Sequence, residues 1–226
     1  MPIHITGMSN VLKPGENADT VSLNSPSEAR PGDLLIAVIA SIATSPTVTV
    51  PAPWRLLRTG SDGANCHAAL FFNTVRASDP PLWRWEWSQP GRAMGWIIAI
   101  GGAGPYLAHG MTPAGGTPST VAAPWVSLPR PRHGNLLYGV IGNELPGTAT
   151  AKTWTSATRG VQLHSWDTTE IGASNITGAV FISYAQPWGP MSASMTVTGG
   201  NGVRSVAFSV AIDADPRMEY GPLPIH

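Results

Sequence analysis

The chain has little charge of either sign. Of its 226 residues, 13 are Lys or Arg and 13 are Asp or Glu, so the formal net charge is zero and only 12% of residues are charged. Without a basic excess there is no general surface for a phosphate backbone, and we expect no nucleic-acid partner. Because the chain has so little charge, electrostatic repulsion between its copies is weak, which favours an oligomer or a larger particle.

Cysteine is almost absent as well. The single residue, Cys66, excludes an intrachain disulfide, and its strand-like neighbours offer no second sulfur ligand. We expect it to be a small buried hydrophobe. The six histidines lie at scattered positions without the spacing of metal-binding pairs, so we predict no metal site and no other cofactor. They are His4, His67, His109, His133, His164 and His226.

Long apolar runs and catalytic motifs are also missing. No apolar run approaches about 18 residues, and no basic segment followed by an apolar core stands at the N-terminus. We therefore expect no membrane insertion, no signal peptide, and synthesis in the cytoplasm of a host cell. There is no Gly-x-Ser-x-Gly elbow, phosphate-cradling loop or dinucleotide fingerprint, so we predict that the protein is not an enzyme. A polysaccharide-degrading enzyme would need two carboxylates facing each other across a groove, and no pair is marked in this way.

The residues that are abundant indicate an all-β fold. The chain has 25 Gly, 22 Pro and nine Trp, and 42% of its residues are hydrophobic. Its apolar runs are short, rich in β-branched and aromatic residues, and bounded by Gly, Pro, Asn or Asp about every 8–12 residues. No segment has a convincing helical period. This pattern is typical of antiparallel β-sandwiches or barrels.

An internal repeat divides the chain. The run GDLLIAVIA at residues 32–40 is echoed by GNLLYGVIG at 134–142, an offset of 102 (32 to 134). Other segments match in the same order, with offsets that drift from 100 to 112. The drift predicts an insertion near residues 162–174, where polar and small residues cluster. The further matches are Trp54 with Trp154, 69–72 with 179–182, 96–100 with 208–212, and 21–23 with 126–128.

The repeat predicts two tandem, similar antiparallel β-sandwich units of jelly-roll or immunoglobulin-like type, produced by internal duplication. Between them lies a segment whose Gly and Pro exclude a helix and a central strand, and which we interpret as a linker. Whether the two units form one domain or two is left open. The predicted boundaries are 1–103 for the first unit, 104–119 for the linker, 120–214 for the second unit and 215–226 for a C-terminal arm.

Tryptophans supply the first candidate site. Trp83, Trp85 and Trp87 alternate along one predicted strand and project to one face. In one interpretation this stripe fills the core between two sheets, with Trp54 and Trp96 as partners. In the other, Trp87 at the end of the strand stacks on a sugar ring.

The predicted insertion supplies the second candidate site. His164, Trp166 and Asp167 form the densest group of polar and aromatic residues in the chain, with Glu170 nearby. They constitute either a binding loop or a longer surface loop of ordinary polarity. We assign no acid or base role to them. The candidate glycan-binding residues are therefore His164, Trp166, Asp167 and Trp87.

Residues 21–103 also carry a family resemblance. They contain RPGDLLIA at 30–37, PAPWRLL at 51–57 and FFNTV at 71–75, followed by ASDP at 77–80, LWRW at 82–85 and GWIIAI at 95–100. These phrases, in this order, resemble a recurring unit in tail, fibre and minor virion proteins of tailed bacteriophages. The second copy lacks the Pro-Ala-Pro sequence before Trp154, so its resemblance depends mainly on the internal repeat.

The resemblance implies a structural virion component, such as a head fibre, decoration protein or tail-associated protein. Its expected partners are other virion proteins and further copies of itself, and its expected location is the virion. The alternative is a host-glycan-binding, receptor-binding module of the same particle, which would touch host surface polysaccharide. The exposure of the tryptophan side chains distinguishes the two hypotheses.

Overall fold

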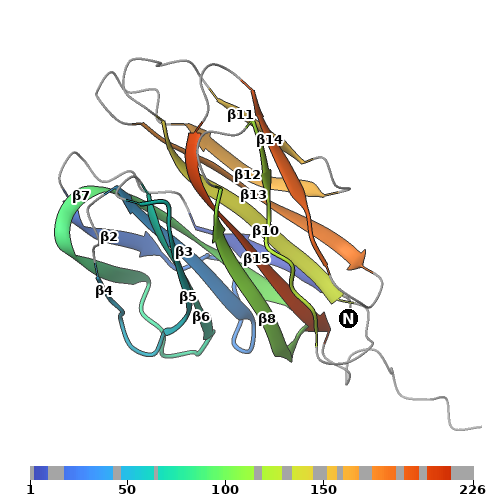
Figure 1. Cartoon of the computed structure of the whole chain (residues 1–226). Helices are drawn as coiled ribbons and strands as arrows, with labels where there is room; N and C mark the ends of the chain where they lie inside the picture. The colour runs from blue at the N-terminus through green and yellow to red at the C-terminus, as the bar shows by residue number, and fades with distance from the viewer. Residues whose placement is uncertain are drawn as a thin grey trace, which may run out of the picture.

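The computed structural model describes residues 3–9, 18–42, 47–63, 66–114, 119–128, 134–144, 152–156, 160–167, 175–186, 191–198 and 203–214. Every regular element in these ranges is a β-strand, which confirms the all-β prediction (Figure 1). Over the same residues there is no helix that could cross a membrane.

The first half of the chain forms two antiparallel sheets. A five-stranded sheet has the order β1-β7-β3-β6-β5, and in a three-stranded sheet β2 and β4 both pair with the beginning of β7. The long strand β7 therefore belongs to both sheets and changes sheet near Gly91 and Arg92. The strands are β1 (His4–Met8), β2 (Ala18–Asn24), β3 (Leu34–Ile42), β4 (Val48–Thr49), β5 (Arg55–Ser61), β6 (His67–Thr74) and β7 (Leu82–Gly101).

The second half repeats this plan strand for strand. Its five-stranded sheet has the order β12-β13-β10-β15-β8, and its three-stranded sheet the order β11-β14-β9. Each strand from β1 to β6 corresponds in order to one from β8 to β13, and β7 corresponds to β14 and β15 together. The strands are β8 (Ala103–Pro113), β9 (Thr120–Ala122), β10 (Gly134–Glu144), β11 (Thr153–Ser156), β12 (Val161–Asp167), β13 (Asn175–Gln186), β14 (Ser194–Thr198) and β15 (Val203–Ala214).

Even an irregularity is duplicated. The pairing of β5 with β6 shifts register between Leu56 and Arg58, and the pairing of β12 with β13 shifts between Gln162 and His164. Both shifts lie at equivalent positions, 106 residues apart (56 to 162). Because a bulge bends an edge strand in a defined way, its recurrence supports the predicted internal duplication.

The four sheets stack in layers with three apolar clusters between them. A central cluster fills the space between the two five-stranded sheets, and one outer cluster in each half fills the space beneath its three-stranded sheet. Successive side chains of a strand point to opposite faces of its sheet, so each five-stranded sheet contributes to two clusters. On β3, Leu34, Ile36 and Val38 face the central cluster, and Leu35 and Ala37 face the first outer cluster. Since the central cluster draws on both halves, the halves share a core.

Equivalent residues meet across this central cluster. The rings of Trp96 on β7 and Phe208 on β15 lie 6.0 Å apart at an interplanar angle of 47°. The sequence match of residues 96–100 with 208–212 is thus confirmed, because both segments present the same face to the same cluster. Contact between equivalent positions is the property of a two-fold, isologous interface, here within one chain.

The segment that we predicted to be a linker is largely a strand. Residues 103–113 form β8, which pairs with β15 at the edge of the second five-stranded sheet and lies beside β5 of the first half (Figure 1). The linker prediction, 104–119, is wrong for residues 104–113, because Gly and Pro exclude a central strand but are tolerated at a sheet edge. The predicted C-terminal arm, 215–226, lies outside the described residues.

The match of residues 32–40 with 134–142 is displaced by one residue. Val38 on β3 lies opposite Trp96, whereas Gly139 on β10 lies opposite the equivalent Phe208. The true offset in these strands is 101 (38 to 139) rather than 102. Both strands are apolar on both faces, so the sequence contains no signal for which face is which.

Two other matches also fail. Trp154 lies within β11, while Trp54 follows β4 without belonging to a strand. The residue opposite Val197 is Trp154, just as the residue opposite Trp87 is Val48. Likewise the strand equivalent to β2 is β9, and residues 126–128 follow it. These matches were made on residue type, on a large side chain in one case and on common residues in the other. Strand pairing aligns the two halves differently at both places.

The predicted inserted loop is wrong in part. Residues 161–167 form the edge strand β12, and residues 168–174 lie outside the described residues. The offset in residue number between equivalent residues of the two halves, as strand pairing defines them, rises along the chain. It is 101 at β10, 106 at β12, 110 at β13 and 112 at β15. The second half therefore gained its extra residues at several connections instead of one.

Candidate functional site

The tryptophan stripe belongs to the first outer cluster. Trp83, Trp85 and Trp87 are 2%, 0% and 6% exposed. The ring of Trp54 packs edge-on against Trp83 at 5.7 Å and Trp85 at 5.3 Å. The interpretation of the stripe as core is confirmed for these residues, although the expected partner Trp96 faces the central cluster instead.

The other three candidate residues lie on β12, in the opposite half from Trp87. His164 is exposed, and partial burial of its ring lowers its pKa. Trp166 and Asp167 end the strand opposite Gly178 and Thr177, and their side chains are outside the described part of the structure. The four candidates therefore come from two separate strands, one in each half.

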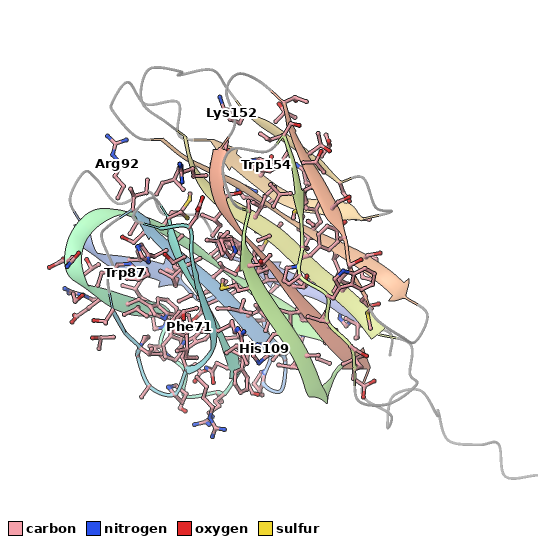
Figure 2. The ribbon with its side chains drawn as sticks, viewed as in Figure 1. Phe71, Trp87, Arg92, His109, Lys152 and Trp154 are labelled. Carbon is pink, nitrogen blue, oxygen red and sulfur yellow. The ribbon has the colours of Figure 1, made fainter. Side chains whose placement is uncertain are left out.

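Trp87 does line a cavity of about 560 Å³. We call this cavity the first mouth, because it lies where the two sheets of the first half open between the edge strands β4 and β5. Trp87, which lines this cavity, is labelled in Figure 2. The lining residues are Thr47, Val48, Leu56, Thr59, Gly60, Ser61, His67, Ala68, Ala69 and Trp87.

Strand register places polar groups at the rim of the first mouth. Thr59 and Ser61 on β5 pair with Ala69 and His67 on β6, so all four share the face that is turned toward the small sheet. Leu56, on the same face, is 50% exposed. The lining contains no Asp, Glu, Lys or Arg side chain. The first mouth thus offers hydroxyl and imidazole groups above an apolar floor.

The equivalent opening of the second half is closed. Trp154 on β11 is 1% exposed, and its indole Nε1 donates a hydrogen bond to Oγ1 of Thr177 at 2.9 Å. Thr177 is the equivalent of His67, 110 residues earlier, which lines the first mouth. In both halves a Val and a Trp lie opposite each other on neighbouring strands of the small sheet, but the Trp is on a different strand in each half. Val48 on β4 lies opposite Trp87, whereas Trp154 on β11 lies opposite Val197. An indole on the outer strand fills the opening.

Sequence reasoning missed most of the first mouth. Trp87 was a candidate, but Thr59, Ser61 and His67 were not, because they meet only through the pairing of β5 with β6. One signal was available in principle. Once the two halves are aligned by strand, Val48 stands where the second half has Trp154.

A second cavity, of about 350 Å³, lies beside β1 and is lined by charged residues. At its wall Asp33 accepts a hydrogen bond from Oγ1 of Thr6 at 2.8 Å and from the backbone N–H of Arg30 at 2.9 Å. These bonds fix the turn before β3 against β1. The carboxylate of Asp33 therefore has a structural task in this cavity.

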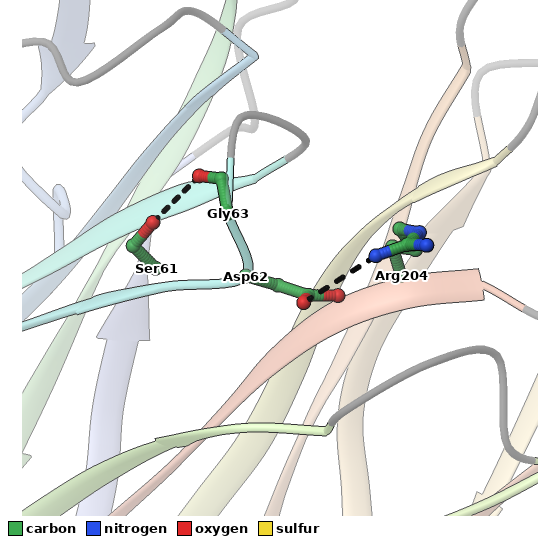
Figure 3. A network of polar contacts seen from close by, with 4 residues as sticks. All are labelled: Ser61, Asp62, Gly63 and Arg204. Carbon is green, nitrogen blue, oxygen red and sulfur yellow. Dashed lines mark hydrogen bonds and ion pairs between the residues drawn. The ribbon is translucent and has the colours of Figure 1, made fainter.

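Polar contacts also join the two halves near the end of β5 (Figure 3). Asp62 forms an ion pair with Arg204 of β15 at 3.9 Å. Beside it, within the first half, Oγ of Ser61 donates to the carbonyl of Gly63 at 2.8 Å. Nearby, the Sγ of Cys66 donates to the carbonyl of Ile141 at 3.7 Å. Burial raises the pKa of this thiol to about 12, with a contribution from Asp62. Such a thiol is protonated and unreactive at neutral pH.

Among the described residues, no group of three or more His, Cys, Asp or Glu side chains is arranged to hold a metal ion. Comparisons with protein-family models, with curated proteins and with solved structures found no match to this chain.

Proposed function

We propose that this protein is a non-enzymatic structural component of a bacteriophage or phage-like particle, of the head-fibre, decoration or tail-associated kind. The resemblance of residues 21–103 to virion proteins suggested this role. The observation that carries it is that several large apolar side chains are exposed on a chain with few charges, because the burial of apolar surface drives most protein–protein association. They are Leu56, Leu82, Trp125, Val161 and Tyr184.

The direct test is to purify particles from cells that carry the gene and to measure the protein in them by quantitative mass spectrometry and immunogold labelling. We expect a fixed number of several copies per particle and a regular position of the gold label. An abundant cytoplasmic protein of the same cells serves as the control for carry-over. Protein that is abundant in the lysate and absent from the particles would contradict the proposal.

Light scattering of the purified protein, with and without host surface polysaccharide, separates this role from its alternative. A defined oligomer that is indifferent to polysaccharide supports an assembly role. A change of mass on addition of polysaccharide supports the host-glycan-binding module instead. The first mouth favours that alternative, because its uncharged hydroxyl groups above an apolar floor suit a neutral sugar ring. In that case Thr59→Val would weaken binding.

A further inference from the structure

Trp125 is exposed on a fixed segment of backbone. Its side chain is 71% exposed, the largest value among the large apolar side chains of the described residues. On either side the backbone is tied to the strand region before β14: the N–H of Ala123 donates to Ala193 at 2.8 Å, and Val126 exchanges two hydrogen bonds with Met191 at 3.0 and 2.7 Å. The indole is therefore presented to solvent from a rigid position.

Such a tryptophan has the properties of an interface anchor. Burying it removes about 150–250 Å² of surface from water, and anchors of this type dominate the binding energy of many interfaces. A rigid backbone lowers the entropy that association costs. An anchor of this kind binds only where the partner has a cavity that accepts an indole.

The chain itself shows that a mouth of this construction accepts an indole. In the second half, Trp154 fills the opening between β11 and the large sheet and bonds to Thr177. In the first half the equivalent opening is a cavity of about 560 Å³, with His67 at the position of Thr177 and the shorter Val48 opposite Trp87. The first mouth is thus an opening of the same construction whose outer strand supplies no indole, although Trp87 lines it from the inner strand.

We propose that Trp125 of one copy docks in the first mouth of a second copy. This inference rests on the assembly role proposed above and names the partner as the chain itself. The hydroxyl oxygens of Thr59 and Ser61 lie at the rim as acceptors for the indole N–H, beside the imidazole of His67. The anchor and the lining contain no Asp, Glu, Lys or Arg, so docking desolvates no carboxylate, ammonium or guanidinium group.

The contact is heterologous. Trp125 belongs to the second half and the first mouth to the first half, so each copy carries one anchor and one mouth. Repeating a contact of this kind closes a ring or extends a filament. Addition of a partner strand is a weaker explanation of the first mouth, because β4 has two residues and β5 is interrupted by a bulge. Neither edge offers a regular run of backbone groups for pairing.

Two variants separate the anchor from the mouth. Trp125→Ala removes the anchor, and Thr59→Arg places a charge at the rim of the mouth; both positions are exposed, so we expect both variants to fold. Matched controls are Leu82→Ala, which removes another exposed apolar side chain, and Ser165→Arg on β12, the equivalent of Thr59. All five proteins are examined by sedimentation and light scattering over a range of concentrations.

We expect the mass of the wild type to rise with concentration, and each test variant to associate at least about tenfold more weakly. The controls should behave as the wild type does. An equimolar mixture of Trp125→Ala and Thr59→Arg should form 1:1 dimers and nothing larger, because the first retains only a mouth and the second retains only an anchor.

Three outcomes would overturn the inference. If the wild type assembles and both variants assemble equally well, the contact lies elsewhere and the assembly role survives. If both variants are impaired but their mixture does not dimerise, the two surfaces are not complementary. If the wild type stays monomeric, while a β-1,4-linked glucose hexasaccharide shifts the NMR signals of Thr59, Ser61 and His67, the mouth is a saccharide site and the assembly role loses its support as well.

Discussion

The two halves of the chain have the same strand order, the same bulge and the same division into a large and a small sheet, yet they differ at the opening between those sheets. In the second half Trp154 fills the opening; in the first half the large residue is Trp87 on the inner strand, and a cavity remains. Duplication thus preserved the backbone plan while one exchange of side-chain size left one copy with a candidate binding site.

The central cluster shows a second difference between the halves. At equivalent positions β3 has Val38 and β10 has Gly139, and a Cβ atom added to Gly139 would lie 2.5 Å from the carbonyl oxygen of Ala179 and 2.6 Å from Cζ of Phe208. The ring of Phe208 occupies the room that a side chain at Gly139 would need. The two halves therefore differ in side-chain size at equivalent positions where the two five-stranded sheets face each other, and Gly139 leaves the room that Phe208 fills.

The largest effect that we expect from breaking this comparison comes from Trp154→Ala. It removes a fully buried indole and leaves Thr177 without its donor, which should destabilise the fold by about 3–5 kcal/mol. Denaturant unfolding measures the loss. The exposed Trp125→Ala is the control and should change stability by less than about 0.5 kcal/mol. Equal losses in both variants would show that Trp154 does not close the second opening.

Gly139→Val, which copies the first half into the second, should destabilise the fold by about 1–3 kcal/mol or more, because the added atoms overlap Phe208 and backbone. Thermal and denaturant unfolding measure this effect. A compensating variant, Gly139→Val with Phe208→Leu, should recover part of the loss. Wild-type stability in the single variant would mean that the packing of the central cluster is loose.

The ion pair between the halves should contribute less. Asp62 and Arg204 are 3.9 Å apart, and the arginine side chain is 39% exposed, so we expect a coupling free energy of about 0.2–1 kcal/mol. A double-mutant cycle with Asp62→Asn and Arg204→Gln measures it. The coupling should fall at high salt. A coupling that is unchanged by salt would contradict an ionic origin.

The smallest effect concerns pH. Burial lowers the pKa of His109 on β8, with a further contribution from the charge of Arg58, and burial also lowers the pKa of His164. The folded protein then binds fewer protons than the unfolded chain, so the free energy of unfolding should fall as pH drops below about 6.5. Comparing unfolding at about pH 7.5 and about pH 5 checks this, and His109→Gln should reduce the difference. A rise in stability at the lower pH would reverse the sign.

Local pattern was sufficient for the class of fold. Short apolar runs between Gly and Pro predicted strands, and the alternation of Trp83, Trp85 and Trp87 predicted one face of a core, as the structure shows. Register was harder. Leu34 and Leu136 matched in sequence but face different clusters, because a strand that is apolar on both sides can slide by one residue without a visible change of pattern.

The candidate site was harder to predict from the sequence than the fold was. Trp87 was recognised because it belongs to the alternating run of Trp83, Trp85 and Trp87, but its neighbours in the mouth are common residues from separate strands. His164, Trp166 and Asp167 looked like a loop because polar residues cluster there, whereas polarity is also what an edge strand shows to solvent. Polarity alone does not distinguish the two.

The amino-acid sequence by itself determined an all-β chain with a duplicated unit, because strand period, turn residues and repeats are local properties that survive without knowledge of contacts. The tertiary structure alone decided how the two units combine: a shared central cluster, a segment such as 103–113 turned into an edge strand, and one mouth closed while the other stays open. These features depend on which residues meet across sheets. Such contacts, as between Trp96 and Phe208, join segments far apart in the chain, and no local pattern encodes them.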